Sequence, residues 1–280
     1  MSAHDQAINL HYGHGDLSAT ILATLQKAGK NIDRLTRDDL RAFDEFHFGG
    51  IEETRSLARL ACLKEGISIV DVGSGLGGPA RTLAAEFGCH VTGLDLTEEF
   101  CHAAEMLTER TGLNGQVTFQ WGNALEMPFA DSIFDVAWTQ FAGMNIEDKP
   151  RFYSECRRVL KDGGRLAFHE VMAGTVNNLH YPAFWANDAS LSFLRRPEEI
   201  HKLLTESGFK QVEWQDVTEH TAQLFDSLLE RARQNDPLPL DLSTFVVDNL
   251  PQKAANALRN MKEQRMVVVM AVFALAKEGD

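Results

Sequence analysis

The stretch ISIVDVGSGLGG, residues 67–78, decides the fold of this 280-residue chain. Its apolar first half predicts a short buried strand, and the four glycines in its last six residues predict a tight turn. Pro79 and the apolar spacing up to residue 87 then predict a helix, because proline fits the first helical turn. Since glycine lets the backbone turn tightly and approach a ligand closely, the stretch indicates the opening of a nucleotide-binding crossover.

An acid in the first strand indicates which ligand the turn holds. Gly73, Gly75 and Gly78 satisfy the G-x-G-x-x-G spacing of dinucleotide sites, although a tight turn without a ligand satisfies it too. Asp71 lies in the apolar strand just before them, where a buried carboxylate needs a cationic or hydrogen-bonding partner. Because a phosphate would repel Asp71, this acid favours S-adenosylmethionine (SAM), which carries an ammonium, a sulfonium and no phosphate.

A second acid ends the next predicted strand, residues 90–95. Asp95 falls close to the ~20-residue offset at which a carboxylate binds a ribose in such crossovers. The alternative is that Asp95 caps the helix predicted for residues 97–111, for which Thr97 is also an N-cap candidate.

Strands and helices alternate through the middle of the chain. Further strands are predicted at 117–121, 136–140, 166–171, 209–217 and 266–276, and further helices at 148–160, 197–206, 222–233 and 252–261. Repeated strand–helix–strand units imply a mostly parallel sheet with helices on both faces, whose ligands bind at the carboxyl ends of the strands. That rule gathers Gly73–Gly78, Asp95, Asn123, Gln140 and the pair His169-Glu170 around one crevice.

A small helical layer precedes the first strand. Helices are predicted at 17–25, after Thr36 and at 52–63, whereas the polar segment 4–16 is expected to be mobile. The phrase FHFGG, residues 46–50, is the most unusual part of this layer. Either His47 has a role in a pocket, or it is exposed while Phe46 and Phe48 pack in the core.

The segments VDVGSGLGG (70–78) and GLDL (93–96) resemble those of class I SAM-dependent methyltransferases. The resemblance continues in GNALEMPF (122–129), FDVAW (134–138) and RVLKDGGRL (158–166). It is strongest to small-molecule enzymes of the sarcosine/dimethylglycine N-methyltransferase and ubiquinone C-methyltransferase type. It implies an α/β, Rossmann-like, seven-stranded sheet that is mostly parallel, with one antiparallel strand. Residues 1–64 would form a helical cap and residues 65–280 the core, with a helical insert at about 222–262 that acts as a lid or an oligomer contact, for example in a homodimer.

The resemblance also implies roles for single residues in SAM binding. The methionine part would lie against the glycine turn, at Gly73, Ser74, Gly75 and Gly77, with Asp71 nearby. The nucleoside would lie against the residues that follow the second and third strands, with Asp95 on the ribose hydroxyls and Leu96, Asn123 and Ala124 on the adenine. Asn123 stands where the family often has aspartate, and an amide oxygen still accepts a hydrogen bond there.

Methyl transfer from a sulfonium is an in-line displacement of an already activated group. The protein has to align the reacting atoms and exclude water, so we expect no metal, no covalent nucleophile and at most one group that takes a proton. The pair His11 and His14 is joined by no acid or cysteine cluster. The catalytic candidates are His47, Gln140, Glu170 and Trp185.

Two of these candidates carry an alternative. Strand alternation lets only one of His169 and Glu170 face the pocket, and Glu170 is favoured while His169 would be a satisfied, half-buried histidine. The loop NLHYPAFWA, residues 178–186, either supplies Trp185 to an aromatic cage for a substituted ammonium, together with Phe46, Phe48 or Trp138, or is packing for the loop itself. Asn145 stands where many relatives carry histidine, which removes one candidate base.

Composition excludes some classes of function. The net charge of −13 gives no basic field for nucleic acid. No signal peptide and no apolar run of ~18 residues is found, so no membrane partner is expected. The four cysteines are scattered, which indicates reduced thiols in a cytoplasmic protein.

Three functions compete at this stage. The first is SAM-dependent methylation of a small molecule, most of all an amine of the glycine, sarcosine or dimethylglycine kind, with oxygen, sulfur and carbon acceptors as alternatives. The second is an NAD-dependent dehydrogenase, against which Asp71 and Pro79 argue. The third is a non-catalytic protein that binds SAM.

Overall fold

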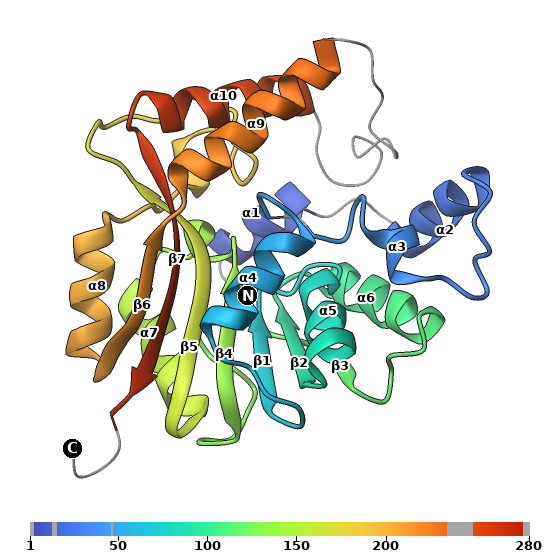
Figure 1. Ribbon diagram of the computed structural model, residues 1–280, viewed down its shortest axis with the longest axis horizontal. Helices are drawn as coiled ribbons and strands as arrows, with labels where there is room; N and C mark the ends of the chain where they lie inside the picture. The colour runs from blue at the N-terminus through green and yellow to red at the C-terminus, as the bar shows by residue number, and fades with distance from the viewer. Residues whose placement is uncertain (1–2, 13–15, 46, 234–248, 277–280) are drawn as a thin grey trace.

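The computed structural model describes residues 3–12, 16–45, 47–233 and 249–276 of the chain (Figure 1). Its centre is a seven-stranded sheet in the order β3-β2-β1-β4-β5-β7-β6. Strand β7 runs antiparallel to both of its neighbours, β5 and β6, and the other strand pairs are parallel, which confirms the predicted mostly parallel sheet with one antiparallel strand. The strands are β1 Ser68–Val72, β2 His90–Asp95, β3 Val117–Trp121, β4 Phe134–Gln140, β5 Leu160–Ala173, β6 Phe209–Asp216 and β7 Met266–Leu275.

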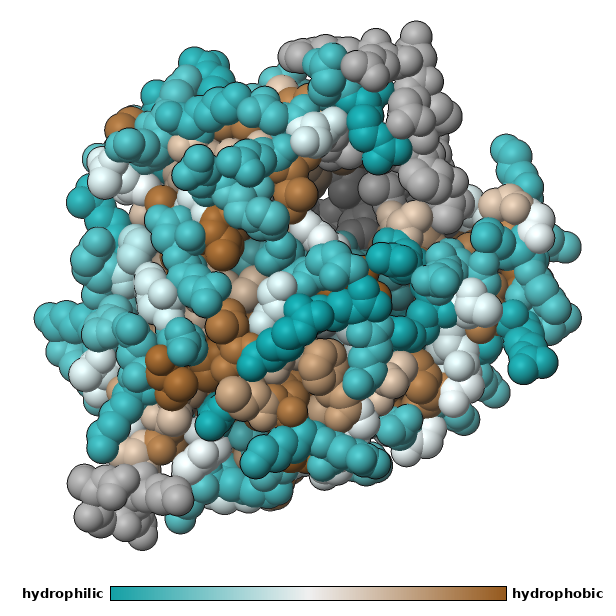
Figure 2. Space-filling view, viewed as in Figure 1, coloured by the Kyte–Doolittle hydropathy of each residue, from teal (hydrophilic) through white to brown (hydrophobic). Residues whose placement is uncertain are grey.

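Helices cover both faces of the sheet because successive residues of its inner strands point to opposite sides. Ile69 packs with residues of α4, α5 and α6 on one face, and Val70 packs with residues of α7 and α8 on the other. The described helices are α1 Ala3–Tyr12, α2 Leu17–Lys27, α3 Arg37–Leu40, α4 Ile51–Leu60, α5 Gly78–Phe87, α6 Glu98–Arg110, α7 Lys149–Val159, α8 Pro197–Glu206, α9 Thr218–Arg233 and α10 Leu250–Lys262. The face seen in Figure 2 is largely hydrophilic, with hydrophobic residues gathered toward the lower part of the view.

The N-terminal layer is helical, as predicted, but it begins earlier than the sequence indicates. Residues 3–12 form α1, so the expectation of a mobile segment over 4–16 is wrong for these residues. The helix is anchored by a tertiary contact, in which the side-chain amide of Asn123 donates to Asp5 Oδ1 at 3.3 Å. The predicted helix start at Thr36 is confirmed by a capping box with Asp39.

The predicted C-terminal insert consists of two helices packed on each other. In Figure 1, α9 and α10 lie together above the ends of β5 and β7. Phe225 of α9 and Ala257 of α10 share an apolar cluster with Phe48 of the N-terminal layer, so the two halves of the chain meet over the sheet. The break predicted at 235–239 lies outside the described residues, and the division into units 1–64 and 65–280 stays a prediction.

The start of α5 is where the N-terminal layer comes closest to the core. A Cβ added at Gly78 would lie 2.1 Å from the carbonyl oxygen of Asp44. Because backbone atoms on both sides meet there, neither side can yield by a rotamer change.

We expect Gly78→Ala to lower the free energy of unfolding by about 1–3 kcal/mol, although alanine is normally the better helix residue, because the added methyl group overpacks this contact. Urea denaturation followed by circular dichroism measures the change. Gly115→Ala is the matched control, since a Cβ there meets nothing within 4 Å. An equal effect of the two substitutions would contradict the close approach.

Candidate functional site

A cavity of about 580 Å³ opens at the carboxyl ends of the central strands. Loops that follow β1, β2, β3 and β4 supply most of its lining, as expected for an α/β sheet. The rest comes from α1, from the segment before α4 and from the loop after β5. Its size is in the range of about 300–1,000 Å³ that is usual for small-molecule sites.

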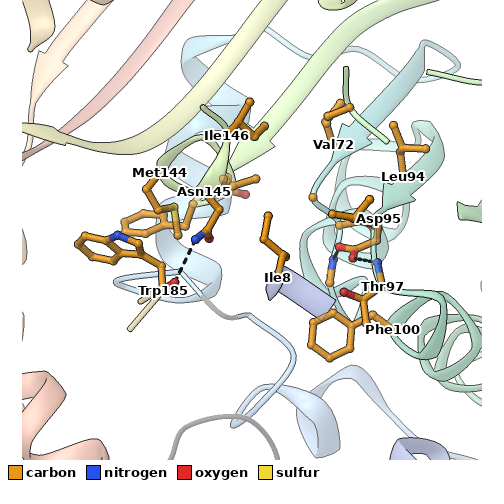
Figure 3. Close-up of a pocket in the computed structure, with 18 of the residues that line it drawn as sticks. Ile8, Val72, Leu94, Asp95, Thr97, Phe100, Met144, Asn145, Ile146 and Trp185 are labelled. Atoms are coloured by element: carbon orange, nitrogen blue, oxygen red, sulfur yellow. Dashed lines mark hydrogen bonds between the residues drawn. The ribbon is translucent and has the colours of Figure 1, made fainter. Parts of the chain in front are cut away.

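The lining divides into two sides in the close-up view, with Ile8 of α1 between them (Figure 3). We call one side the Asp95 wall; it comprises Val72–Gly75, Leu94–Thr97, Phe100 and Gly122–Leu125. We call the other side the Trp185 wall; it comprises His47, Phe48, Phe141, Ala142, Met144–Asp148, Phe184 and Trp185.

The glycine turn is forced by close neighbours. Gly73, Gly75 and Gly77 have φ values of 76°, 52° and 79°, a region that favours glycine. A Cβ at Gly73 would lie 2.3 Å from the Cβ of Ala142, and a Cβ at Gly77 would lie 2.4 Å from the ring of Phe119. Gly73, Ser74 and Gly75 therefore lie on the pocket wall, whereas Gly77 lies outside the lining and faces Phe119.

Asp95 is fixed by two backbone groups. Its Oδ2 accepts the N–H of Gly75 at 2.8 Å and its Oδ1 accepts the N–H of Thr97 at 2.9 Å, as the dashed lines in Figure 3 show. Each carboxylate oxygen keeps a further lone pair, so Asp95 can accept two hydroxyl groups from a ligand. Thr97 is the N-cap of α6 by position, but its side chain makes no capping bond.

The rest of the Asp95 wall suits a flat ring. Leu96, Phe100 and Leu125 supply apolar surface, and Ala124 lies beside them. Asn123 Oδ1 accepts the N–H of Leu125 at 2.8 Å and keeps one lone pair for a ligand amino group.

Asp71 lies behind the wall. It is buried, its Oδ2 has no hydrogen-bond partner among the described residues, and it does not line the pocket. Burial, followed by the nearby carboxylates of Glu45 and Asp95, raises the pKa of Asp71 to about 8.

Two further polar atoms in the pocket lining lack partners. Ser74 Oγ and Gln140 Nε2 are buried and have no hydrogen-bond partner in the described part of the chain. Such atoms are costly unless a bound molecule satisfies them. With Asp95, they fit a ligand that carries hydroxyl, amino and carboxylate groups, as SAM does.

A hydrogen-bond network joins the N-terminal layer to the end of β4. His47 Nε2 lies 2.7 Å from Glu45 Oε2, and the hydroxyl of Thr54 lies 3.0 Å from the same nitrogen. Gln140 Oε1 accepts this hydroxyl at 3.1 Å and the indole N–H of Trp138 at 2.9 Å. His47 is therefore buried at the pocket rather than exposed.

Neither member of the pair His169 and Glu170 lines the pocket, so the expectation that one of them faces it is not met. Glu170 Oε1 accepts the N–H groups of Ala142 and Gly143, at 3.2 and 3.0 Å, and braces the loop η1, Gly143–Asn145, from behind. His169 is buried against the ring of Phe141, and burial holds its pKa well below the usual value.

Several aromatic residues both pack against one another and line the pocket. Phe48 contacts Phe141, Phe184 and Phe225, with ring centroids 4.6, 5.4 and 4.7 Å apart. Trp185 lines the pocket while its indole N–H donates to the hydroxyl of Ser192 at 2.9 Å.

The structure gives no support for a cage role of the two other residues that we predicted for it. Trp138 is fully buried and outside the lining, and Phe46 lies outside the described residues.

Asn145 ties the Trp185 wall together, because its side-chain amide donates to the carbonyl oxygens of Trp185 and Leu191 at 3.0 and 2.8 Å. The sequence analysis missed Asp5 and Ile8 of α1, and it missed Glu45 and Thr54 of the network. The spacing of Glu45 and His47, an acid two residues before a histidine, is the one signal that points to any of them.

The described residues contain no group of three or more His, Cys, Asp or Glu placed to hold a metal ion. The side chain of His11 and all of His14 lie outside those residues. All four cysteines are free. Within the described ranges, every helix is too short or too polar to cross a membrane.

Comparison with known proteins adds to this geometry. The sequence profile of the family described as "Methyltransferase domain" matches residues 70–168. The glycine/sarcosine/dimethylglycine N-methyltransferase of Actinopolyspora halophila is 30% identical over 194 residues, which cover 69% of this chain and 34% of that protein. A sterol 24-C-methyltransferase of Gibberella zeae is 39% identical over 114 residues, covering 41% of this chain and 30% of that protein. The chain thus spans about a third of the length of these curated relatives.

The fold has solved counterparts. Phosphoethanolamine N-methyltransferase 2 of Haemonchus contortus, in complex with phosphomonomethylethanolamine and S-adenosylhomocysteine, matches with a TM-score of 0.72 at 21% identity, covering 86% of this chain and 58% of that one. Residues 70–168 of the chain thus match the methyltransferase-domain family, and the chain has the fold of a SAM-dependent methyltransferase. The family match runs from β1 into β5 and includes the whole Asp95 wall, whereas α1, the segment before α4 and residues 184–185 lie outside it.

The raised pKa of Asp71 makes stability depend on pH. Between the ordinary value of 3.8 and about 8, the folded chain holds a proton on Asp71 that the unfolded chain has lost. The contribution of this proton to stability is complete below about pH 4 and is lost as pH rises to about 8.

We therefore expect the free energy of unfolding of the wild type to fall from about pH 5 to about pH 8, relative to Asp71→Asn, by at most about 1.4 kcal/mol per pH unit. Urea titrations across this range measure it. Asp33→Asn, which changes a carboxylate with 91% of its side chain exposed, should keep the slope of the wild type. Parallel curves for wild type and Asp71→Asn would contradict the buried proton.

Proposed function

We propose that the chain binds SAM between the two walls and transfers its methyl group to a small-molecule amine. The observation that carries the proposal is Asp95, a carboxylate fixed beside the glycine turn by two backbone N–H groups. No lysine or arginine is among the described lining residues, so the charge of a pyrophosphate cofactor such as NAD would be met there by backbone N–H groups alone and opposed by Asp95.

The Asp95 wall would hold the nucleoside. Asp95 would accept both ribose hydroxyls, and Asn123 Oδ1 would accept the adenine amino group over the apolar surface of Leu96. The methionine part would lie along Gly73–Gly75. Ser74 Oγ and Gln140 Nε2, which have no hydrogen-bond partner among the described residues, would bind its polar groups.

Bound SAM supplies an activated methyl group, so the chain has to align an acceptor and keep water out. The Trp185 wall faces the place where the methyl group would lie, and the rings of Phe48, Phe141 and Phe184 close it with apolar surface. Glu170 acts through the loop that it braces, as a positioning residue.

His47 is the proton acceptor in this proposal. It lines the pocket, and the carboxylate of Glu45, 2.7 Å from its Nε2, stabilises the imidazolium that forms when the ring takes a proton. Gln140 is held to the same network through Thr54 and orients its amide at the junction of the two walls.

Nitrogen is preferred as the accepting atom because of the family resemblance and because the pocket is acidic. Carbon is the alternative that the sterol methyltransferase relative favours. A homodimer stays a prediction, as does a non-catalytic SAM-binding role, which would give SAM binding without turnover of any acceptor.

Asp95→Ala should raise the dissociation constant for SAM roughly 5- to 150-fold, the equivalent of about 1–3 kcal/mol for hydrogen bonds to a charged group. Isothermal titration calorimetry measures it, with Asp33→Ala as the surface control. Unchanged SAM binding would remove the ribose role. NADH titrated in parallel tests the dehydrogenase alternative, which requires tighter binding than that of SAM.

His47→Gln should lower kcat by about 10²–10⁴-fold while the dissociation constant for SAM stays within a factor of about two, since general-base catalysis contributes on that scale. Glu45→Gln should give a smaller loss of kcat. His102→Gln changes an exposed histidine of α6 and is the control. An unchanged kcat, or an equal loss of SAM binding, would refute His47 as the proton acceptor.

A further inference from the structure

We propose that the acceptor is a hydrophobic amine that carries no carboxylate or phosphate group. This inference rests on the proposed function and narrows the amines that the Trp185 wall accepts. The proposed acceptor differs from the amino acids and the phosphorylated amine that appear in the names of two similar proteins.

The charges around the pocket have one sign. Five carboxylates belong to its lining, those of Asp5, Asp44, Asp95, Glu147 and Asp148, of which Asp44 is paired with Arg81, and no lysine or arginine is found among the described lining residues. Among the side chains that are not described, the basic ones are those of Arg233 and Lys277. A second anion brought into this field is repelled, whereas an ammonium group is attracted.

Cations close to the pocket are already engaged. Lys149, at the start of α7, donates its ammonium hydrogens to the carbonyl oxygens of Gly143, Ile146 and Phe193. Burial lowers the pKa of Lys149 to about 8. Its positive charge is therefore used behind the Trp185 wall and is not presented to a ligand.

The same holds on the other side of the cavity. Arg81 is fully buried and donates to Asp44 Oδ2 at 2.8 Å and to the carbonyl oxygen of Leu76 at 2.7 Å. His47 faces the carboxylate of Glu45. An acceptor carboxylate would thus enter the cavity without a described lysine or arginine of the lining to pair with it, and burial of an unpaired charge is strongly unfavourable.

The uncharged part of the Trp185 wall selects for an apolar body. Phe48, Phe141, Met144, Ile146, Phe184 and Trp185 supply most of its surface. Aromatic faces attract an ammonium group and pack against hydrocarbon, and they offer nothing to a carboxylate. An acceptor as small as glycine would leave this surface unfilled.

A matched pair of amines tests the inference. N,N-dimethyl-2-phenylethylamine and N,N-dimethylphenylalanine share one skeleton and differ by the carboxylate. We expect the full-length chain, saturated with S-adenosylhomocysteine, to bind the first at least ~10-fold more tightly, because the second buries an unpaired charge among like charges. Calorimetry measures both dissociation constants without requiring turnover.

A substitution that reverses the charge at the rim of the pocket should improve the binding of the carboxylated amine. Glu147 is exposed and lines the pocket, so Glu147→Lys places a cation there with little cost to folding. We expect Glu147→Lys to reduce the ratio of the two dissociation constants (carboxylated over uncarboxylated amine) by at least ~5-fold, because the new lysine pairs with the carboxylate. Glu147→Gln should reduce this ratio less. Thermal melts of both variants verify that they fold.

The outcomes are separable. Equal or tighter binding of the carboxylate, no binding of either amine, or no effect of Glu147→Lys on the ratio overturns the inference. Failure to bind SAM at all, measured beforehand, would refute the proposed function itself. A third outcome is that the chain binds SAM and prefers the uncarboxylated amine but releases no S-adenosylhomocysteine in a turnover assay. This outcome would support the binding preference and refute methyl transfer.

Discussion

The hydrogen bonds that Asp95 accepts from the backbone of Gly75 and Thr97 are the interaction on which the site depends. They join the end of β2 to the turn after β1 and to the start of α6, so three elements meet at one carboxylate. The turn requires glycine at two positions, because Gly75 has a φ of 52° and a Cβ at Gly73 would lie 2.3 Å from the Cβ of Ala142. The geometry of the Asp95 wall follows from this contact.

Buried charge determines how the N-terminal layer docks on the sheet. Arg81 of α5 pairs with the carboxylate of Asp44, and the carboxylate of Glu45 lies 2.7 Å from His47 Nε2, so one of the four acids near the turn is matched by a permanent positive charge. Asp71 has no hydrogen bond at Oδ2 from the described residues, and Asp95 accepts the backbone N–H groups of Gly75 and Thr97. Asp95 belongs to the pocket lining and so offers its carboxylate to a ligand, whereas burial raises the pKa of Asp71 to about 8 and keeps that acid protonated.

The two walls of the pocket are built in different ways. The Asp95 wall follows directly from three strand ends that lie side by side in the sheet. The Trp185 wall is assembled from the segment before α4, the loop after β4 and the loop after β5. Glu170 and Lys149 hold the middle segment from behind through backbone atoms. A wall made in this way can change its side chains without disturbing the sheet, which is how one fold serves many acceptors.

The sequence by itself determined the seven-stranded sheet, the glycine turn and the place of Asp95, because apolar periodicity and glycine spacing are local signals that tertiary packing here reinforces. Only the tertiary structure decided that residues 3–12 form a helix on the pocket, that Phe119 covers Gly77, and that Glu170 braces a loop instead of lining the cavity. It alone also paired Lys149 with the backbone carbonyl of Gly143 and Arg81 with the carboxylate of Asp44. These outcomes depend on contacts between residues far apart in the chain, on which local pattern carries no information.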